Sequence, residues 1–168
     1  MPSRSRAAAK ADEVLATEKT GSHFVEASLI KGQCLFALGA TDPSNYALAL
    51  AAFDPVVKGK DGTIAERNEA AVQSAKCLEK MGKPDDAEAL YINVLYGRTA
   101  GDDATSPVPP EFSWQIESGW QAARIREARK DWRGAIEIYR RMEQIGGAHQ
   151  QLFRDLQNKL RQDNYIYE

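Results

Sequence analysis

Small and apolar side chains recur along this chain at the three- and four-residue spacing of a helix face. The clearest case is residues 71–95, where such residues repeat on both sides of Gly82. This spacing predicts amphipathic helices, and a glycine between two such patterns predicts a helix end followed by a turn. Residues 71–95 are therefore interpreted as two short helices folded back on one another.

The same pattern divides the rest of the chain into hairpins flanked by single helices. The expected hairpins span about 22–57, 63–96 and 111–146, with a lone helix at 5–19 and a capping helix at 148–162. Alanine is abundant and clusters of β-branched residues are few, which favours helices over strands. We therefore expect an all-α fold of about eight helices in a single domain that spans residues 1–168.

Local signals predict several of the helix ends. Ser22 is the expected N-cap of the second helix, which is expected to stop at Gly39. Pro55 is expected to kink the following helix or end it early, because proline removes a backbone donor. Residues 97–110 have no periodicity and are rich in proline, so they predict an extended loop. The Pro107-x-x-Pro110 element in this loop is interpreted as a spacer rather than a ligand for a proline-binding domain.

The three predicted hairpins share a small residue in the first helix and an Ala-x-x-x-aromatic pair in the second. The small residues are Gly32, Ala75 and Ala123, and the pairs are Ala49 with Phe53, Ala87 with Tyr91, and Ala135 with Tyr139. A small residue lets two helix axes approach closely, and the aromatic ring fills the gap to the next hairpin. Because one hairpin cannot bury its apolar face alone, we expect the hairpins to stack.

This arrangement resembles the tetratricopeptide repeat family over roughly residues 22–146. In the second hairpin, the residues at the family's spacing are Ala75, Leu78, Gly82, Ala87 and Tyr91. The first hairpin is longer and the third lacks the glycine between its helices, so the resemblance is to degenerate repeats of variable length. It implies a right-handed α-α superhelix, a TPR-like solenoid, which acts as a non-enzymatic scaffold for protein–protein interaction.

The resemblance also implies a concave groove, lined by the first helices, that binds a peptide or helix of a protein partner. The implied partner-binding residues are Gln33, Phe36, Lys76, Glu79, Trp120, Arg124 and Glu127. The same helix faces also carry Glu26, Leu29, Glu69, Val72 and Glu117. Gln33, Lys76 and Arg124 form a ladder of hydrogen-bond donors, and tryptophan and arginine are frequent binding hot spots. The alternative interpretation of these residues is an ordinary solvated helix face.

Charge and apolar content narrow the classes of function. The net charge is −2, from 22 basic and 24 acidic residues, so no global field attracts nucleic acid or an anionic membrane. The basic residues between Arg124 and Arg141 alternate with Glu127, Asp131 and Glu137, as on an exposed helix with intrahelical ion pairs. No apolar run approaches the length of a membrane span. We therefore expect no nucleic-acid partner and no membrane insertion.

No catalytic, cofactor or metal site is indicated. Cys34 and Cys77 hold equivalent places in consecutive hairpins, where they are interpreted as small core residues too far apart for a disulfide. His23 and His149 have no neighbours at the spacing of metal ligands. The nucleophile elbow, the phosphate-binding loop and the dinucleotide fingerprint are all missing from the sequence. We expect no enzymatic activity and no cofactor.

Three alternatives to the scaffold remain open, and one of them is a nucleic-acid role through the basic residues from Arg124 to Arg141, which requires steeply salt-dependent binding. The repeats are similar to those of bacterial periplasmic or outer-membrane-associated tetratricopeptide proteins, which implies an assembly helper. In another alternative, the stack is an oligomerisation segment of a larger assembly. Its contact with the assembly is then made by the unpaired first helix or by Tyr165 and Tyr167. The first residues are basic without an apolar run behind them, so a cytoplasmic location is expected for the chain as given. A fragment of an exported protein would instead be periplasmic or envelope-associated.

Overall fold

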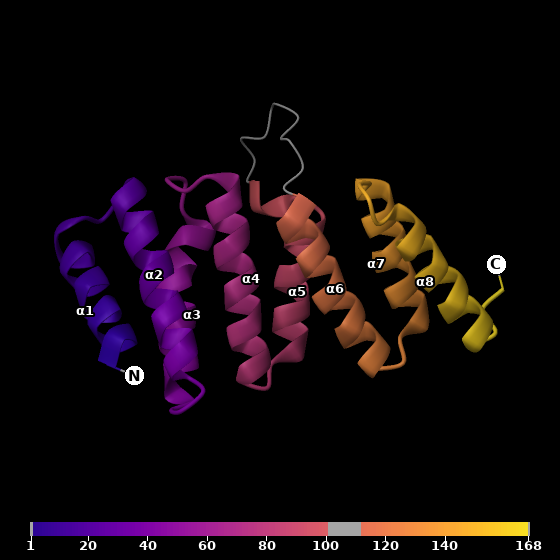
Figure 1. The fold of residues 1–168 in the computed structure, drawn as a ribbon, viewed down its shortest axis with the longest axis horizontal. Coiled ribbons are helices and arrows are strands. Elements are labelled where there is room, and N and C mark those ends of the chain that lie inside the picture. The colour runs from indigo at the N-terminus through magenta and orange to yellow at the C-terminus, as the bar shows by residue number, and fades with distance from the viewer. Residues whose placement is uncertain (1, 101–111, 168) are drawn as a thin grey trace. The chain divides into compact units, whose positions relative to one another are not determined.

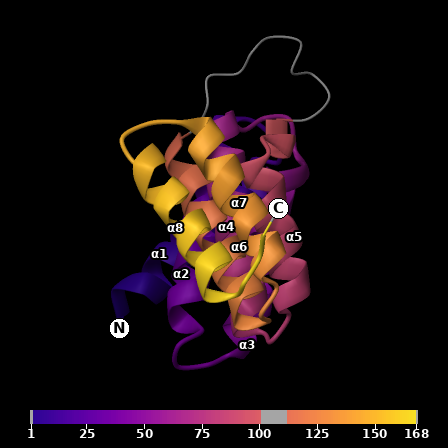
Figure 2. The same ribbon diagram turned by 90° about the vertical axis from the view of Figure 1, so that its right-hand side faces the viewer.

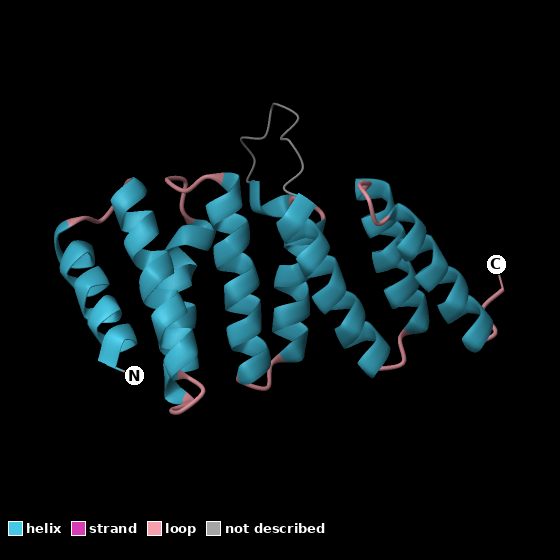
Figure 3. Ribbon diagram, viewed as in Figure 1, coloured by secondary structure: helices cyan, strands magenta, loops and turns pink. Residues whose placement is uncertain are grey.

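The computed structural model describes residues 2–100 and 112–167, and these fold into eight α-helices without a strand among them (Figure 3). The helices are α1 (Pro2–Thr17), α2 (Ser22–Leu38), α3 (Ser44–Lys58), α4 (Ile64–Lys80), α5 (Pro84–Leu95), α6 (Phe112–Ala128), α7 (Trp132–Ile145) and α8 (Gln150–Asp163). The predicted all-α class and the predicted number of about eight helices are confirmed.

The chain divides into two compact units, Met1–Leu90 and Tyr91–Glu168. In the first unit α1 packs on α2, α2 on α3 and α3 on α4, and α2 also touches α4 (Figure 1). In the second unit α6 packs on α7 and α7 on α8, and the last two helices lie side by side in both views (Figure 1, Figure 2). Helices that follow one another in sequence are thus neighbours within each unit. The single domain and the right-handed superhelix stay predictions.

The core of the first hairpin shows what its small residue does. Phe53 is fully buried, and a Cβ atom built on Gly32 would lie 2.3 Å from Cε1 of the Phe53 ring. Glycine therefore leaves the space that the ring occupies between α2 and α3. Leu29 of α2 and Cys77 of α4 belong to the same apolar cluster. Gly32 thus makes room for the aromatic ring of its own hairpin, while the close approach of the two helix axes stays a prediction.

Two predicted helix ends need correction. Ser22 is the first residue of α2 and not its N-cap; Gly21, with φ 88°, holds the cap position without a side-chain hydrogen bond. Pro55 does not end α3, which continues to Lys58. Proline leaves the carbonyl of Ala51 without its helical donor, but Ala51 is exposed to solvent, whereas Val56 in the last turn is buried. Burial of that turn offsets the lost hydrogen bond.

The turns after α4 and α6 have the same backbone conformation although their residues differ. Gly82 has φ 73° and Lys130 has φ 59°, both in the left-handed region. In each turn the amide that follows this residue donates to the carbonyl five positions earlier, at 2.9 Å. This is the Schellman arrangement that closes helix C-termini. The glycine that the third hairpin lacks is therefore replaced by a lysine in the same conformation.

Part of the predicted loop at residues 97–110 is helical. After α5 the chain forms a short 3₁₀ turn, η1 (Arg98–Ala100), so these three residues are not extended. Residues 101–111 lie outside the described residues, and with them the Pro107-x-x-Pro110 element. The third hairpin resumes at Phe112, close to the predicted start at residue 111.

Candidate partner-binding surfaces

A hydrogen bond joins the first helices of the first two hairpins. Gln33 Nε2 of α2 donates to Glu69 Oε1 of α4 at 2.6 Å, on the solvent-accessible side of the first unit. Lys76 lies seven residues, or two helical turns, beyond Glu69 on the same face of α4. Gln33, Glu69 and Lys76 therefore form one polar strip that crosses from α2 to α4.

The first helix of each hairpin (α2, α4 and α6) carries the same pair of polar positions. A glutamate is followed seven residues later by a hydrogen-bond donor, in the pairs Glu26 with Gln33, Glu69 with Lys76, and Glu117 with Arg124. On α6, Arg124 Nε donates to Gln121 Oε1 at 3.1 Å, and Gln121 Nε2 donates to Glu117 Oε1 at 3.2 Å. A relay of polar side chains thus follows the accessible face of α6, in the positions that the strip occupies on α4.

Three predicted binding residues take part in packing within their own units. Trp120 lies against Tyr139 of α7 with a ring separation of 5.7 Å, and at the same separation from Phe153 of α8. Phe36 meets the ring of Tyr46 in α3 edge-on at 5.5 Å. Both side chains are half-buried. They hold their helices together, and their contact with a partner stays a prediction.

Glu127, the third of these residues, accepts a hydrogen bond from the Tyr139 hydroxyl at 2.6 Å. Burial, and then the bond to this carboxylate, raise the pKa of the Tyr139 phenol above its ordinary value. The phenol therefore remains protonated and remains a donor throughout the physiological range. Glu127 fixes α6 against α7 and has less freedom than the exposed Arg124 to rearrange for a partner.

The remaining predicted binding residues differ in how accessible their side chains are. Gln33 and Arg124 are exposed, while Lys76 and Glu79 are half-buried on α4. Leu29 and Val72, which share the predicted faces, are buried in the core and are not available to a partner. The apolar part of the predicted groove is therefore smaller than the sequence suggests, and its accessible part is mainly polar.

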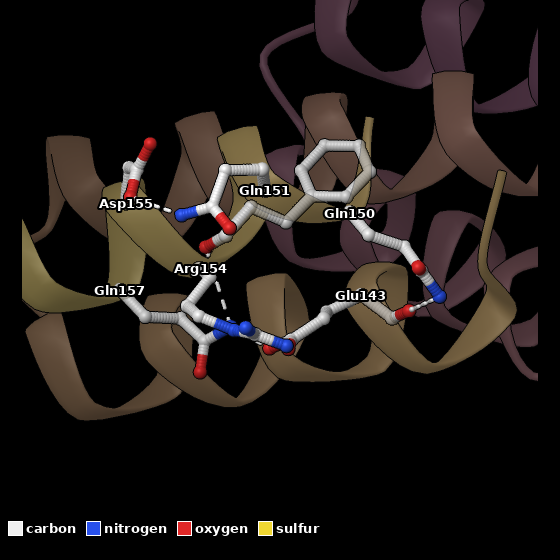
Figure 4. A network of polar contacts seen from close by, with 7 residues as sticks. Glu143, Gln150, Gln151, Arg154, Asp155 and Gln157 are labelled. Carbon is white, nitrogen blue, oxygen red and sulfur yellow. Dashed lines mark hydrogen bonds and ion pairs between the residues drawn. The ribbon is translucent and has the colours of Figure 1, made fainter. Parts of the chain in front are cut away.

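A carboxylate fixes α8 to α7 in the second unit (Figure 4). Glu143 Oε1 accepts from Arg154 Nε at 2.9 Å and from Nη2 at 2.7 Å, and Oε2 accepts from Gln157 Nε2 at 2.8 Å. The bonds from Arg154, and then the bond from Gln157, hold the pKa of the Glu143 carboxyl below its ordinary value. This network stabilises the position of α8, on which Phe153 meets Trp120.

An apolar cavity of about 430 Å³ lies between α1 and α2. Its walls are Ala7, Lys10, Ala11 and Val14 of α1, Glu18 just after this helix, and His23, Glu26, Ala27 and Ile30 of α2. Ile30 is 39% exposed, which is high for a large apolar residue. Sequence reasoning missed this cavity. The sequence feature that could have predicted it is the row of Ala7, Ala11 and Val14, which recur at helical spacing along α1.

Among residues 2–100 and 112–167, no group of three or more histidine, cysteine or acidic side chains is placed to hold a metal ion. Within the same residues, none of the helices has both the length and the apolar character needed to span a membrane. In comparisons with known proteins, the chain matches no family model, no curated protein and no solved structure.

Proposed function

We propose that this chain is a non-enzymatic, tetratricopeptide-like interaction module that binds a peptide or helix of a partner protein on the accessible faces of its first helices. The observation that carries this proposal is the hydrogen bond from Gln33 to Glu69, because it makes α2 and α4 parts of one polar surface. The relay from Arg124 to Glu117 supports partner binding on α6 as well, which is the first helix of the third hairpin.

The chemistry of these faces favours an extended or helical segment that offers both hydrogen-bond acceptors and donors. Gln33, Lys76 and Arg124 bring amide, ammonium and guanidinium donors, which bind carbonyl and carboxylate oxygens. The glutamates seven residues earlier accept hydrogen bonds from amide groups. Within the first unit, the donor and the acceptor repeat on α2 and α4, which suits a ligand whose polar groups also repeat along its length.

The experiment begins with random peptides displayed on phage and selected on the purified chain. Binding of the selected peptides is then measured by fluorescence anisotropy on wild type and on a Lys76→Glu, Arg124→Glu variant. A matched control, Lys58→Glu with Arg133→Glu, makes the same charge change on the exposed faces of α3 and α7. We expect the first variant to weaken binding about tenfold, because each substitution removes a hydrogen-bond donor from the first helix of its own unit.

The control is expected to change the dissociation constant less than about twofold. Equal effects of the two variants would contradict binding on the first helices, as would selected peptides that neither variant affects. The periplasmic assembly role and the oligomerisation role stay alternative predictions. The location of the parent protein and the oligomeric state in solution separate them from peptide binding.

A further inference from the structure

Helix α2, which forms one wall of the cavity, carries the same sequence pattern as α4. The corresponding residues of α4 are covered by neighbouring helices of the first unit. With Gly32 matched to Ala75, Ala27 corresponds to Ala70 and Cys34 to Cys77. Ala70 and Cys77 are fully buried, in the cluster that α2 and α3 build against α4. Cys34, by contrast, is only half-buried. The face of α4 is covered by two helices, whereas in the described residues the matching face of α2 is covered by α1.

We propose that this cavity binds an amphipathic helix of a partner protein, which lies against α1 and α2 as α2 lies against α3 and α4. The side chains of α1 define the size of the apolar groups that fit. Helix α3 presents the bulky Phe53 to Gly32, whereas α1 presents the small Ala7 and Ala11 to the cavity. The bound helix therefore carries large apolar side chains, such as leucine, at spacings of three, four and seven residues.

The charges at the cavity favour a bound helix with basic or amide side chains. Glu26 is the equivalent of Glu69, which accepts a hydrogen bond at 2.6 Å from Gln33 of the preceding first helix. Glu18 also lines the cavity but lies 3.3 Å from His23 Nδ1, and Lys10 adds a positive charge to the lining, so the preference for a basic group rests on Glu26. A lysine or arginine over Glu26 reproduces the observed contact with a full positive charge.

The exposed face of α8 does not fit this description, which argues against a second copy of the chain as the occupant. Leu152 on α8 is 44% exposed, but Asp155 and Lys159, three and seven residues further on, are exposed and charged. Leu156, four residues after Leu152, is half-buried, so this face mixes apolar and charged side chains. Burial of these two charges in the cavity would be unfavourable.

The test uses two synthetic helical peptides that share one leucine stripe and differ only in the flanking residues, which are lysines in one peptide and glutamates in the other. Each is titrated against wild type, Ile30→Asp and Glu26→Lys. The controls are Leu48→Asp, which changes an apolar residue 55% exposed on α3, and Glu13→Lys, which reverses an exposed charge on α1. Circular dichroism of each variant verifies that its helix content is unchanged.

We expect saturable binding of the lysine peptide to wild type and to both controls. Ile30→Asp should weaken this binding about tenfold or more, because a charge replaces the exposed apolar wall. Glu26→Lys should weaken binding of the lysine peptide about threefold to tenfold and strengthen binding of the glutamate peptide.

Failure of the lysine peptide to bind, or an equal loss in Leu48→Asp, would overturn the proposal. So would a concentration-dependent dimer of wild type that Ile30→Asp converts to a monomer, because a second copy would then fill the cavity. The Lys76→Glu, Arg124→Glu variant leaves the residues of the cavity unchanged. Ile30→Asp in turn leaves Gln33, Lys76 and Arg124 unchanged, so peptide binding on the first helices and helix binding in the cavity can fail separately.

Discussion

The hydroxyl of Tyr139 donates a hydrogen bond to Glu127 Oε1 at 2.6 Å, so a residue expected to meet a partner also joins α6 to α7. Replacing Tyr139 with phenylalanine removes this bond and keeps the ring contact with Trp120. We expect Tyr139→Phe to lower the free energy of unfolding by about 1 kcal/mol. Tyr139→Ala, which also removes the buried ring, should cost about 3–5 kcal/mol. Urea denaturation followed by tryptophan fluorescence measures both changes. Equal losses of stability in the two variants would contradict a contribution from the buried ring.

The Glu143 network predicts a loss of stability in acid. Because the pKa of Glu143 is lowered in the folded state, its contribution is fully present above the unfolded value of about 4.3. The contribution is lost as the pH falls through the lower folded pKa. Urea denaturation at pH 6 and pH 3 should therefore show a smaller acid effect in Glu143→Gln than in wild type. Glu13→Gln, on the exposed face of α1, is the control, and an equal effect in all three proteins would disprove the prediction.

The left-handed conformation of Lys130 predicts a stabilising substitution. A non-glycine residue in this region is strained, and Gly82 takes the same place in the second hairpin, where an added Cβ atom would meet nothing within 4 Å. Lys130→Gly should raise the free energy of unfolding by about 0.5–1 kcal/mol, and Gly82→Lys should lower it by about 1 kcal/mol. Thermal and urea denaturation measure both changes. A shift of the same sign in the two variants would show that backbone strain is not the cause.

The space between Gly32 and Phe53 predicts a coupled pair of substitutions. Gly32→Ala places a methyl group against the ring, which should cost about 1–3 kcal/mol, less the gain of about 1 kcal/mol in helix propensity. In a Phe53→Leu background the smaller side chain leaves room for the methyl group, so the same change should cost less. A double-mutant cycle measures this coupling, and additive effects would mean that the two residues do not compete for space.

The two cysteines should differ in their reactivity toward thiol reagents. Cys77 is fully buried, and burial raises the pKa of its thiol to about 12, so at pH 8 it remains protonated and shielded. Cys34 is half-buried on α2. We expect one thiol to react rapidly in the folded protein and the second only after unfolding. Cys34→Ser should remove the rapid phase; a rapid phase that persists in this variant would place the reactive thiol at Cys77.

Most of the helices could be predicted because their signals are local. The apolar spacing located the hairpins, and Gly39 and Gly82 marked the turns that follow α2 and α4. An early end of α3 at Pro55 was wrong, because a local preference against helix competes with burial of Val56, while the alternative of a kink stays a prediction. The third hairpin has no glycine at its turn, where Lys130 takes the left-handed conformation that Gly82 has in the second hairpin.

The candidate surfaces were harder to predict because periodicity shows which helix face is apolar but not which element covers it. Trp120 and Phe36 lie at accessible positions of an isolated helix, and tertiary packing turns both toward neighbouring rings. The cavity between α1 and α2 was missed for the same reason. Its alanines are typical of a buried helix contact, and their exposure to a cavity depends on the placement of α2.

Partner binding on the first helices is tested most directly by nuclear magnetic resonance of the isotope-labelled chain titrated with a selected peptide. We expect the largest shifts in the signals of the accessible faces of α2, α4 and α6, including Gln33, Lys76 and Arg124. The signals of α3 and α7 should change least. Shifts centred on α3 and α7, with those three residues unaffected, would contradict the proposed binding surface.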